Sequence, residues 1–339
     1  HQLFALPQYP IDAEDHLIGL HASSLVADDG TLQIGIGSLS DALVHSLILR
    51  HEKNEAYHEM ITDFAEHRGA GAQIIPSSLG VFEKGLYGTS EMIMDGFMHL
   101  RKHGILKREV FELNEKKRRY LHGAFFLGTK RFYQWLSSLS EKDFNGLNMT
   151  KVSMVNDLYD AREMAIRQQR KNARFFNSCM NVTLLGGAAA DTLENGQVIS
   201  GVGGQYNFVA MSHELPDAKS VLMFRSTRTK NGKWTSNFVW GHEQIPIPRH
   251  LRAIVVTEYG IADLRGKSDS EVIKQLLNVT DAEFQEGLLQ TAKHNGKIDP
   301  AYEIPEWAKR NTSEKLKSLF SDYQMKGYFP AYPFGSDFN

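Results

Sequence analysis

The sequence predicts an α/β fold in which a mostly parallel sheet carries helices on both faces. Three observations support this prediction. Short apolar, β-branched runs alternate with stretches of helical periodicity, and several of these runs end directly in glycine turns. Runs such as "KSVLMFRST" and "AIVVTEYG" are also continuously apolar, which is typical of strands buried on both sides. Parallel neighbours need crossover helices, so the alternation favours a parallel sheet.

The individual elements are expected in a definite order. The first are a helix over 10–30, a strand over 31–38 that runs into glycines, a helix over 39–61 with Ser40 as a candidate cap, an irregular glycine-rich region over 63–87, and a helix over 92–104 after Glu91. We then expect a strand over 107–128 and a helix over 131–140. The segment 151–186 should contain a strand, a turn, a helix and a second strand, and the segment 197–215 a strand, a glycine turn and a helix. Two further strands are expected over 219–227 and 253–260. A helix over 268–296 begins with Ser268 and Glu271 in a capping-box pattern, and the tail after Ile298 is expected to wrap the surface.

Composition narrows the class of protein. The chain has 339 residues, with 38 Lys and Arg against 40 Asp and Glu, so its formal net charge of -2 gives no electrostatic reason to expect nucleic acid or an anionic membrane as partner. No apolar run approaches a membrane span and no secretory signal is visible. The single cysteine, Cys179, excludes a disulfide within the chain, and we expect a cytoplasmic protein. The first residue is His1, so we expect a piece of a longer protein or a processed chain.

Two glycine turns follow predicted strands, at 35–38 ("GIGS") and 201–205 ("GVGGQ"). Glycine there lets backbone N–H groups approach a ligand, although a simple tight turn explains either run equally well. A dinucleotide fingerprint would need a third glycine, where these runs have serine and tyrosine, so a dinucleotide oxidoreductase is disfavoured. The run "HEKNEAYHE" lacks the H-E-x-x-H spacing and reads as a solvated helix face, so no metal site is predicted.

Two carboxylates stand at positions suited to chemistry. Glu258 ends an apolar strand in "VVTEYG", where a carboxylate must be solvated, paired or protonated, and where α/β proteins place catalytic groups. Glu91 follows Thr89 and Ser90 in "GLYGTSEMIMDGFMHL". On the residues alone, the favoured interpretation is that Thr89 or Ser90 caps a helix and that Glu91 is a first-turn carboxylate. The alternative is that Glu91 is a reagent.

The motifs "TLQIGIG", "TSEMIMDG", "MVND", "SGVGGQ" and "VVTEYGIADLRGK" occur in this order. Together they resemble the acetyl-CoA hydrolase/transferase family of class I CoA-transferases, over about residues 25 to 285 and in the C-terminal half of the family's architecture. The resemblance implies a class I CoA-transferase-like α/β domain over 27–285, after a leading helix and linker over 1–26 and before a C-terminal wrapping tail over 286–339. It also implies a further α/β half in the parent protein, ahead of the 31–38 strand.

The resemblance assigns roles to particular residues. It implies that Glu91 is the catalytic glutamate, that Asn156 lies near the acyl group, that the Gly204 N–H stabilises an oxyanion, and that Glu258 lines the pocket. The positions that it places near coenzyme A are Gly35, Gly37, Gly203 and Gln205. Family members usually carry an acidic residue where Asn181 stands.

The implied function is an acyl-CoA:carboxylate CoA-transferase that works through a glutamyl-CoA thioester intermediate. Coenzyme A is then a substrate rather than a tightly bound cofactor, and the partners are acyl-CoA and a small carboxylate. Two alternatives stay open: an acyl-CoA hydrolase on the same residues, and a non-catalytic acyl-CoA-binding domain of a larger protein. The acyl group, the acceptor and the oligomeric state, a homo-oligomer included, also stay open.

Overall fold

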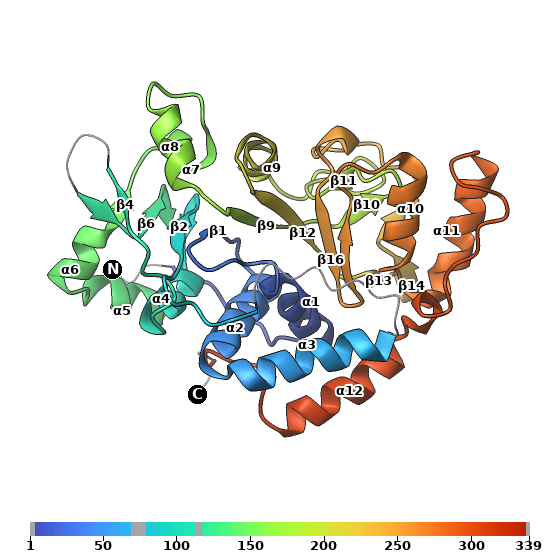
Figure 1. Cartoon of the computed structure of the whole chain (residues 1–339), viewed down its shortest axis with the longest axis horizontal. Helices are drawn as coiled ribbons and strands as arrows, with labels where there is room; N and C mark the ends of the chain where they lie inside the picture. The colour runs from blue at the N-terminus through green and yellow to red at the C-terminus, as the bar shows by residue number, and fades with distance from the viewer. Residues whose placement is uncertain (1–3, 69–78, 113–116, 337–339) are drawn as a thin grey trace.

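An eight-stranded sheet runs through the centre of the molecule in the strand order β17-β16-β12-β9-β1-β2-β6-β8 (Figure 1). The computed structural model describes residues 4–68, 79–112 and 117–336. All neighbouring strands are parallel except β17, which runs antiparallel to β16. The strands are β1 (Thr31–Gln33), β2 (Tyr87–Thr89), β6 (Leu121–Gly123), β8 (Leu147–Met149), β9 (Arg174–Ser178), β12 (Lys219–Met223), β16 (Ile254–Thr257) and β17 (Gly260–Asp263). The predicted α/β fold with a mostly parallel sheet is therefore confirmed.

Helices and short strand pairs surround this sheet. The α-helices are α1 (Ala13–Ser23), α2 (Ser38–Glu52), α3 (Asn54–Arg68), α4 (Asp95–Lys102), α5 (Lys130–Ser137), α6 (Glu141–Gly146), α7 (Ser153–Asn156), α8 (Glu163–Gln169), α9 (Gln205–Glu214), α10 (Asp269–Leu277), α11 (Ala282–His294) and α12 (Ser313–Met325). The remaining strands are β3 (Met92–Ile93), β4 (Val110–Phe111), β5 (Arg118–Arg119), β7 (Phe125–Phe126), β10 (Asn181–Thr183), β11 (Ala188–Ala189), β13 (Thr227–Lys230), β14 (Lys233–Ser236) and β15 (Phe238–Val239). No helix in the described part is long and apolar enough to cross a membrane.

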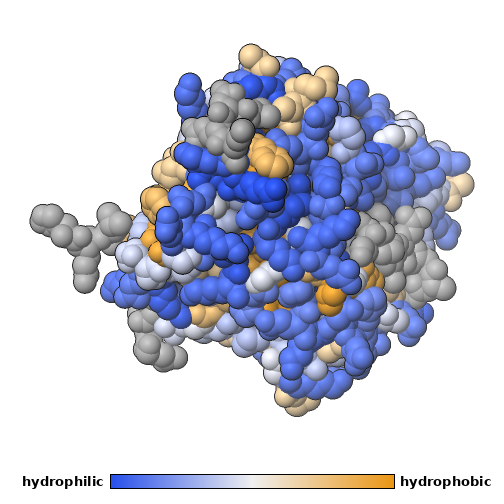
Figure 2. All heavy atoms as spheres, turned by 60° about the vertical axis from the view of Figure 1, so that its left-hand side comes forward, coloured by the Kyte–Doolittle hydropathy of each residue, from blue (hydrophilic) through white to orange (hydrophobic). Residues whose placement is uncertain are grey.

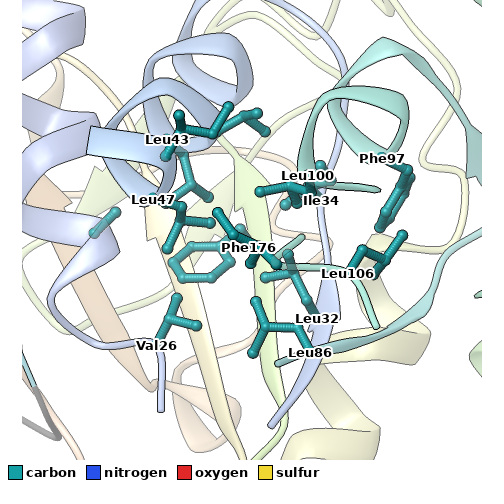
Figure 3. Packing of buried hydrophobic residues seen from close by; sticks show 14 of the residues in the cluster. Val26, Leu32, Ile34, Leu43, Leu47, Leu86, Phe97, Leu100, Leu106 and Phe176 are labelled. Atoms are coloured by element: carbon teal, nitrogen blue, oxygen red, sulfur yellow. The ribbon is translucent and has the colours of Figure 1, made fainter. Parts of the chain in front are cut away.

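Different helices cover the two faces of the sheet, because successive side chains of a strand point to opposite faces. Phe176 of β9 packs in the main core cluster with Leu43 and Leu47 of α2 (Figure 3). Its neighbour Phe175 packs on the other side, where its ring centroid lies 5.4 Å from that of Phe208 in α9. Figure 1 shows α9 on one side of the sheet, with α1 and α2 on the other. The surface seen in Figure 2 is largely hydrophilic, with hydrophobic residues in small separate groups.

Several element boundaries differ from the prediction. The expected helix over 39–61 is two helices, α2 and α3, that meet at Lys53, and α3 continues through the start of the region expected to be irregular, of which 69–78 lies outside the described residues. Ser40 is not the cap of α2, because Gly37 is the N-cap residue. The expected helix over 268–296 is also divided, with Asp281 capping α11 through the Glu283 N–H. The capping box at Ser268 is confirmed.

Two predicted strands do not form. The apolar run over 197–200 belongs to no strand of the described part. It forms only an isolated antiparallel bridge between Val198 and Thr192, and Val198 is 67% exposed. The segment that begins at Lys151 forms the four-residue helix α7 instead of a strand. Both segments contain β-branched or apolar residues, which favour strands. Tertiary context therefore overrides their local preference for strand structure.

The tail after Ile298 contributes to the core as well as to the surface. Phe320, Tyr323 and Phe329 are buried in a cluster with Leu17 of α1 and Tyr57 of α3. Figure 1 shows α12 running beside α3. The tail therefore closes the side of the molecule that carries α1 and α3.

Candidate functional site

Glu91 lies on the connection between β2 and β3, and main-chain hydrogen bonds hold it there. Its carbonyl oxygen accepts from the N–H groups of Ala124 (2.8 Å) and Phe125 (3.1 Å). The preceding Ser90 N–H donates to the carbonyl of His122 at 3.0 Å. Helix α4 begins only at Asp95. The interpretation of Glu91 as a first-turn helix carboxylate is therefore wrong, because the strand pair β3 and β7 occupies the expected start of that helix.

Each oxygen of the Glu91 carboxylate accepts one hydrogen bond. The side-chain amide of Asn156 donates to Oε1 at 2.5 Å, and the backbone N–H of Gly204 donates to Oε2 at 3.2 Å. Asn156 is buried at the end of α7, and Gly204 is the N-cap residue of α9. The positive end of the α9 dipole therefore faces the carboxylate.

Glycine is required at position 204 by space rather than by backbone conformation. The φ of Gly204 is -88°, which any residue adopts. A Cβ atom there would lie 2.5 Å from Cδ of Glu91 and 2.9 Å from Nδ2 of Asn156, which is inside van der Waals contact. The preceding Gly203 has φ +58°, in the left-handed region that favours glycine. Gly203 thus turns the chain, and Gly204, which has no side chain, places its backbone N–H beside the Glu91 carboxylate.

Glu91 faces a cavity of about 370 Å³ at the carboxyl ends of the parallel strands β1 and β9. This edge of an open parallel sheet is where α/β proteins bind ligands. Hydrogen bonds fix the walls of the cavity. The Ser90 hydroxyl donates to the carbonyl of Ile34 at 3.1 Å, and the side-chain amide of Gln205 donates to the carbonyl of Ser178 at 2.9 Å.

The structure brings together most of the residues singled out from the sequence. Besides Glu91 and Gly204, the predicted residues Gly35, Gly203 and Gln205 line the cavity. Gly37 does not line it. With φ +98°, Gly37 begins α2 and lines a separate cavity of about 50 Å³.

Glu258 also lies apart from the Glu91 cavity. It is 2% exposed, its carboxyl group accepts a hydrogen bond from the Ser226 N–H at 2.8 Å, and it lines a space of only about 10 Å³ with Glu14 and Trp234. Burial raises the pKa of Glu258 to about 8, so the group is largely protonated at neutral pH. Of the residues to which the resemblance assigns catalytic roles, Glu91, Asn156 and Gly204 are therefore in contact, whereas Glu258 does not line the Glu91 cavity.

Two polar residues of the cavity were missed from the sequence. Gln33 is 4% exposed and its Oε1 has no hydrogen-bond partner among the described residues, and the same holds for Nδ2 of Asn177. Both are polar residues in or beside otherwise apolar runs, "TLQIG" and "RFFNSC". An isolated amide in such a run is the signal that would have indicated them, because a buried polar group needs a partner. Asn181, by contrast, is buried in β10 and donates to the carbonyl of Asn237 at 3.2 Å.

The fold and the cavity define an α/β protein whose site lies at the carboxyl edge of a parallel sheet, around a carboxylate held by an amide and a backbone N–H. The family model described as "Acetyl-CoA hydrolase/transferase C-terminal domain" matches residues 128–292. Over these residues the chain belongs to the acetyl-CoA hydrolase/transferase family.

Individual relatives carry related names. The 4-hydroxybutyrate coenzyme A transferase of Clostridium kluyveri is 28% identical over 298 residues, which cover 86% of this chain and 57% of that protein. The butyryl-CoA:acetate CoA-transferase of Anaerostipes caccae is 30% identical over 227 residues, which cover 66% of this chain and 47% of that protein. The chain thus spans about half the length of these relatives. The crystal structure of RipA from Yersinia pestis has the same fold, with a TM-score of 0.67, 21% identity and coverage of 88% of this chain and 57% of that one.

Proposed function

We propose that this chain catalyses acyl-CoA:carboxylate CoA transfer with Glu91 as the nucleophile. The observation that carries the proposal is the Glu91 carboxylate at the cavity, held by the Asn156 amide and the Gly204 N–H. The names of the relatives support CoA transfer as the reaction class. Neither a cavity-lining nucleophile nor its two hydrogen-bond donors would be needed by a domain that only binds acyl-CoA.

The reaction begins when a Glu91 oxygen attacks the thioester carbonyl carbon. The C–S bond breaks, coenzyme A leaves as a thiolate, and a mixed anhydride joins the acyl group to Glu91. The thiolate then attacks Cδ of Glu91 and expels the acyl group as a free carboxylate, which leaves a glutamyl-CoA thioester. An acceptor carboxylate attacks this thioester and releases the thiolate. Attack of the thiolate on the new acyl group gives the product acyl-CoA and restores Glu91.

Asn156 and Gly204 have a defined part in these steps. When the thiolate attacks Cδ of Glu91, negative charge develops on a Glu91 oxygen that already lies beside one of these donors. The donors therefore need no rearrangement to stabilise the tetrahedral intermediate. One such donor is typically worth about 3–4 kcal/mol of transition-state stabilisation.

Coenzyme A would approach Glu91 along the glycine runs. Gly35 and Gly203 line the cavity and leave room for the pantetheine arm close to the main chain, and the Gln205 side chain closes one wall. Oε1 of Gln33 and Nδ2 of Asn177, which have no hydrogen-bond partner in the described part of the chain, are available to polar groups of the substrate. Gly37 lies outside the cavity, so we no longer assign it a contact with the reacting end of coenzyme A.

Hydrolysis is the second candidate, because Glu91 is only partly buried and water can reach the cavity. In that reaction, water instead of a carboxylate resolves the acylated glutamate. Exclusion of water decides between the two outcomes.

Intact-protein mass spectrometry after incubation with acetyl-CoA tests the proposal. We expect a covalent coenzyme A adduct that maps to Glu91, that borohydride reduces to the alcohol, and that is absent from Glu91→Ala. Addition of butyrate or 4-hydroxybutyrate should then discharge the adduct and produce the corresponding acyl-CoA. Release of free coenzyme A without a new acyl-CoA would indicate the hydrolase. An adduct of equal yield on Glu91→Ala would refute Glu91 as the nucleophile.

A further inference from the structure

A second cavity, of about 350 Å³, lies over the β2, β6 and β8 end of the sheet, where α7 and α8 pack (Figure 1). It shares no lining residue with the Glu91 cavity. Its volume is in the range of sites for small molecules. Neither the motifs nor the proposed reaction uses it.

Arg170, just after α8, is the most unusual group in this cavity. It is 3% exposed, and its guanidinium donates to the carbonyl of Met154 at 2.6 Å and to the sulfur of Met211 at 2.9 Å. No carboxylate oxygen of the described residues forms an ion pair with it. A buried cation without a counterion is costly, so Arg170 is a strong point of attraction for an anion.

The other charges around the cavity leave this imbalance in place. Glu112 is the acidic residue of the described lining, and it is already held by the Arg119 guanidinium at 3.0 Å and by the Asn148 amide. Arg162 is paired with Asp160 at 2.9 Å. The exposed Lys151 forms no ion pair with a described carboxylate. Among the described residues, Arg170 and Lys151 therefore form no direct ion pair with a carboxylate, although Asp157 acts electrostatically on Arg170 and Asp160 interacts in the same way with Lys151.

The cavity also offers neutral polar groups. The Tyr87 hydroxyl lies 2.9 Å from Nδ1 of His122, and both side chains are part of the lining. Burial lowers the pKa of His122 to about 4, so this imidazole is neutral at pH 7 and adds no charge. Thr150, with its hydroxyl group, and Asn148, with its amide, also line the cavity, so the lining can form hydrogen bonds with a small polar ligand.

We propose that this cavity binds a small organic anion bearing carboxylate or phosphate groups, held by Arg170 and Lys151. Guanidinium and ammonium groups recognise both oxyanions through charge-assisted hydrogen bonds. The proposal is independent of the proposed function, because it uses no residue of the Glu91 cavity. The competing explanation is that Arg170 only holds α7 in place through the Met154 carbonyl.

Methionine methyl NMR of the full chain distinguishes these explanations, because Met154 lines this cavity whereas Met92 lines the Glu91 cavity. The probes are succinate and inorganic phosphate, titrated separately. We expect a saturable shift of the Met154 methyl signal and an unchanged Met92 signal. A response to succinate alone identifies a carboxylate site, a response to phosphate alone identifies a phosphate site, and a response to both identifies a general oxyanion site.

Variants assign the binding to the two cations. Lys151→Gln changes an exposed residue and should weaken binding about threefold to tenfold. Arg170→Gln should abolish the Met154 shift if the variant folds. The matched control is Lys233→Gln, on β14 and outside this cavity, which should bind as the parent does. The proposal is overturned if neither probe shifts Met154 up to about 10 mM, if only Met92 responds, or if Lys151→Gln binds as tightly as the parent.

Discussion

At the scale of single residues, the identity of one residue depends on the side chain of another. Gly204 has an ordinary backbone conformation, so nothing local requires glycine there. The requirement comes from Glu91, whose carboxylate occupies the space that a side chain at 204 would fill. The side-chain amide of Asn156 donates to the same carboxylate, so Glu91, Gly204 and Asn156 form one contact group.

The first prediction concerns the reach of the nucleophile. Glu91→Asp shortens the side chain by one methylene and withdraws the attacking oxygen by about 1 Å, which should reduce kcat/KM for transfer about 100-fold. Glu91→Ala should have no activity. Both variants should keep the parental melting temperature within a few degrees, because the main chain of Glu91 is anchored independently of its side chain. Parental turnover by Glu91→Ala would contradict the proposed chemistry.

The second prediction concerns the contact at Gly204. Gly204→Ala should displace the Glu91 carboxylate and slow formation of the coenzyme A adduct about 100-fold or more. The control is Gly241→Ala, where a Cβ atom meets no atom within 4 Å, and which should form the adduct at the parental rate. The two rates are compared by mass spectrometry at early times. Equal rates for both variants would mean that Gly204 is only a turn residue.

At the scale of elements, short connections carry the site. Asn156 stands on α7, a helix of four residues that is too short to be stable by itself. Contacts from other segments hold α7. Among them, the Arg170 guanidinium donates to the Met154 carbonyl at 2.6 Å, and the Thr89 hydroxyl donates to the Val155 carbonyl at 3.5 Å. The position of the Asn156 amide therefore depends on tertiary contacts rather than on helix propensity.

The third prediction concerns the start of α10. Ser268 accepts from the Glu271 N–H and Glu271 reaches back to the Ser268 N–H, so Ser268→Ala should cost about 1 kcal/mol, or roughly 2–4 °C in Tm. Thr312 is the matched control, because it is the N-cap residue of α12 without a side-chain cap bond. Thr312→Ala should shift Tm less than Ser268→Ala does. Equal shifts would show that the capping box adds nothing.

At the scale of the whole molecule, the C-terminal tail packs against the buried His16 and the partly buried His99. His16 is 0% exposed and its Nε2 lies 3.0 Å from the carbonyl oxygen of Pro330, to which it donates. The Phe334 ring stacks on His99 with a centroid distance of 4.0 Å. Burial lowers the pKa of His16 to about 4 and that of His99 to about 3. The docked tail thus requires neutral imidazoles.

The fourth prediction follows from the direction of these pKa shifts. The folded pKa of His16 lies below its unfolded value of 6.5, so the unfolded state binds more protons between about pH 4 and pH 6.5. The stability contributed by neutral His16 is therefore fully present above pH 6.5 and is lost as pH falls toward 4. Denaturant unfolding at pH 7 and pH 5 should show that His16→Gln loses about 1–2 kcal/mol less than the parent. The exposed His294→Gln is the control and should follow the parent. Identical pH dependence of His16→Gln and the parent would rule out this role.

The sequence predicted what depends on local pattern. Continuous apolar runs located β12 and β16, and residues of both glycine turns line the Glu91 cavity. Prediction from the sequence failed where segments far apart in the chain determine the local structure or the lining of a cavity. The exposed run at Val198 has strand-forming residues, but among the described residues it pairs only through an isolated antiparallel bridge to Thr192. Gln33 gave no recognisable motif, because its importance comes from the cavity that it faces. Glu258 had a suggestive motif but does not line the Glu91 cavity.

The anchoring of Glu91 has an evolutionary consequence. The bonds from Ala124 and Phe125 to the Glu91 carbonyl, and from Ser90 to the His122 carbonyl, join main chain to main chain. Such bonds are the same whatever side chains those positions carry. Cavity residues such as Met92 can therefore diverge among descendants of this chain without moving the carboxylate, so that substrate preference can drift while the reacting group keeps its place.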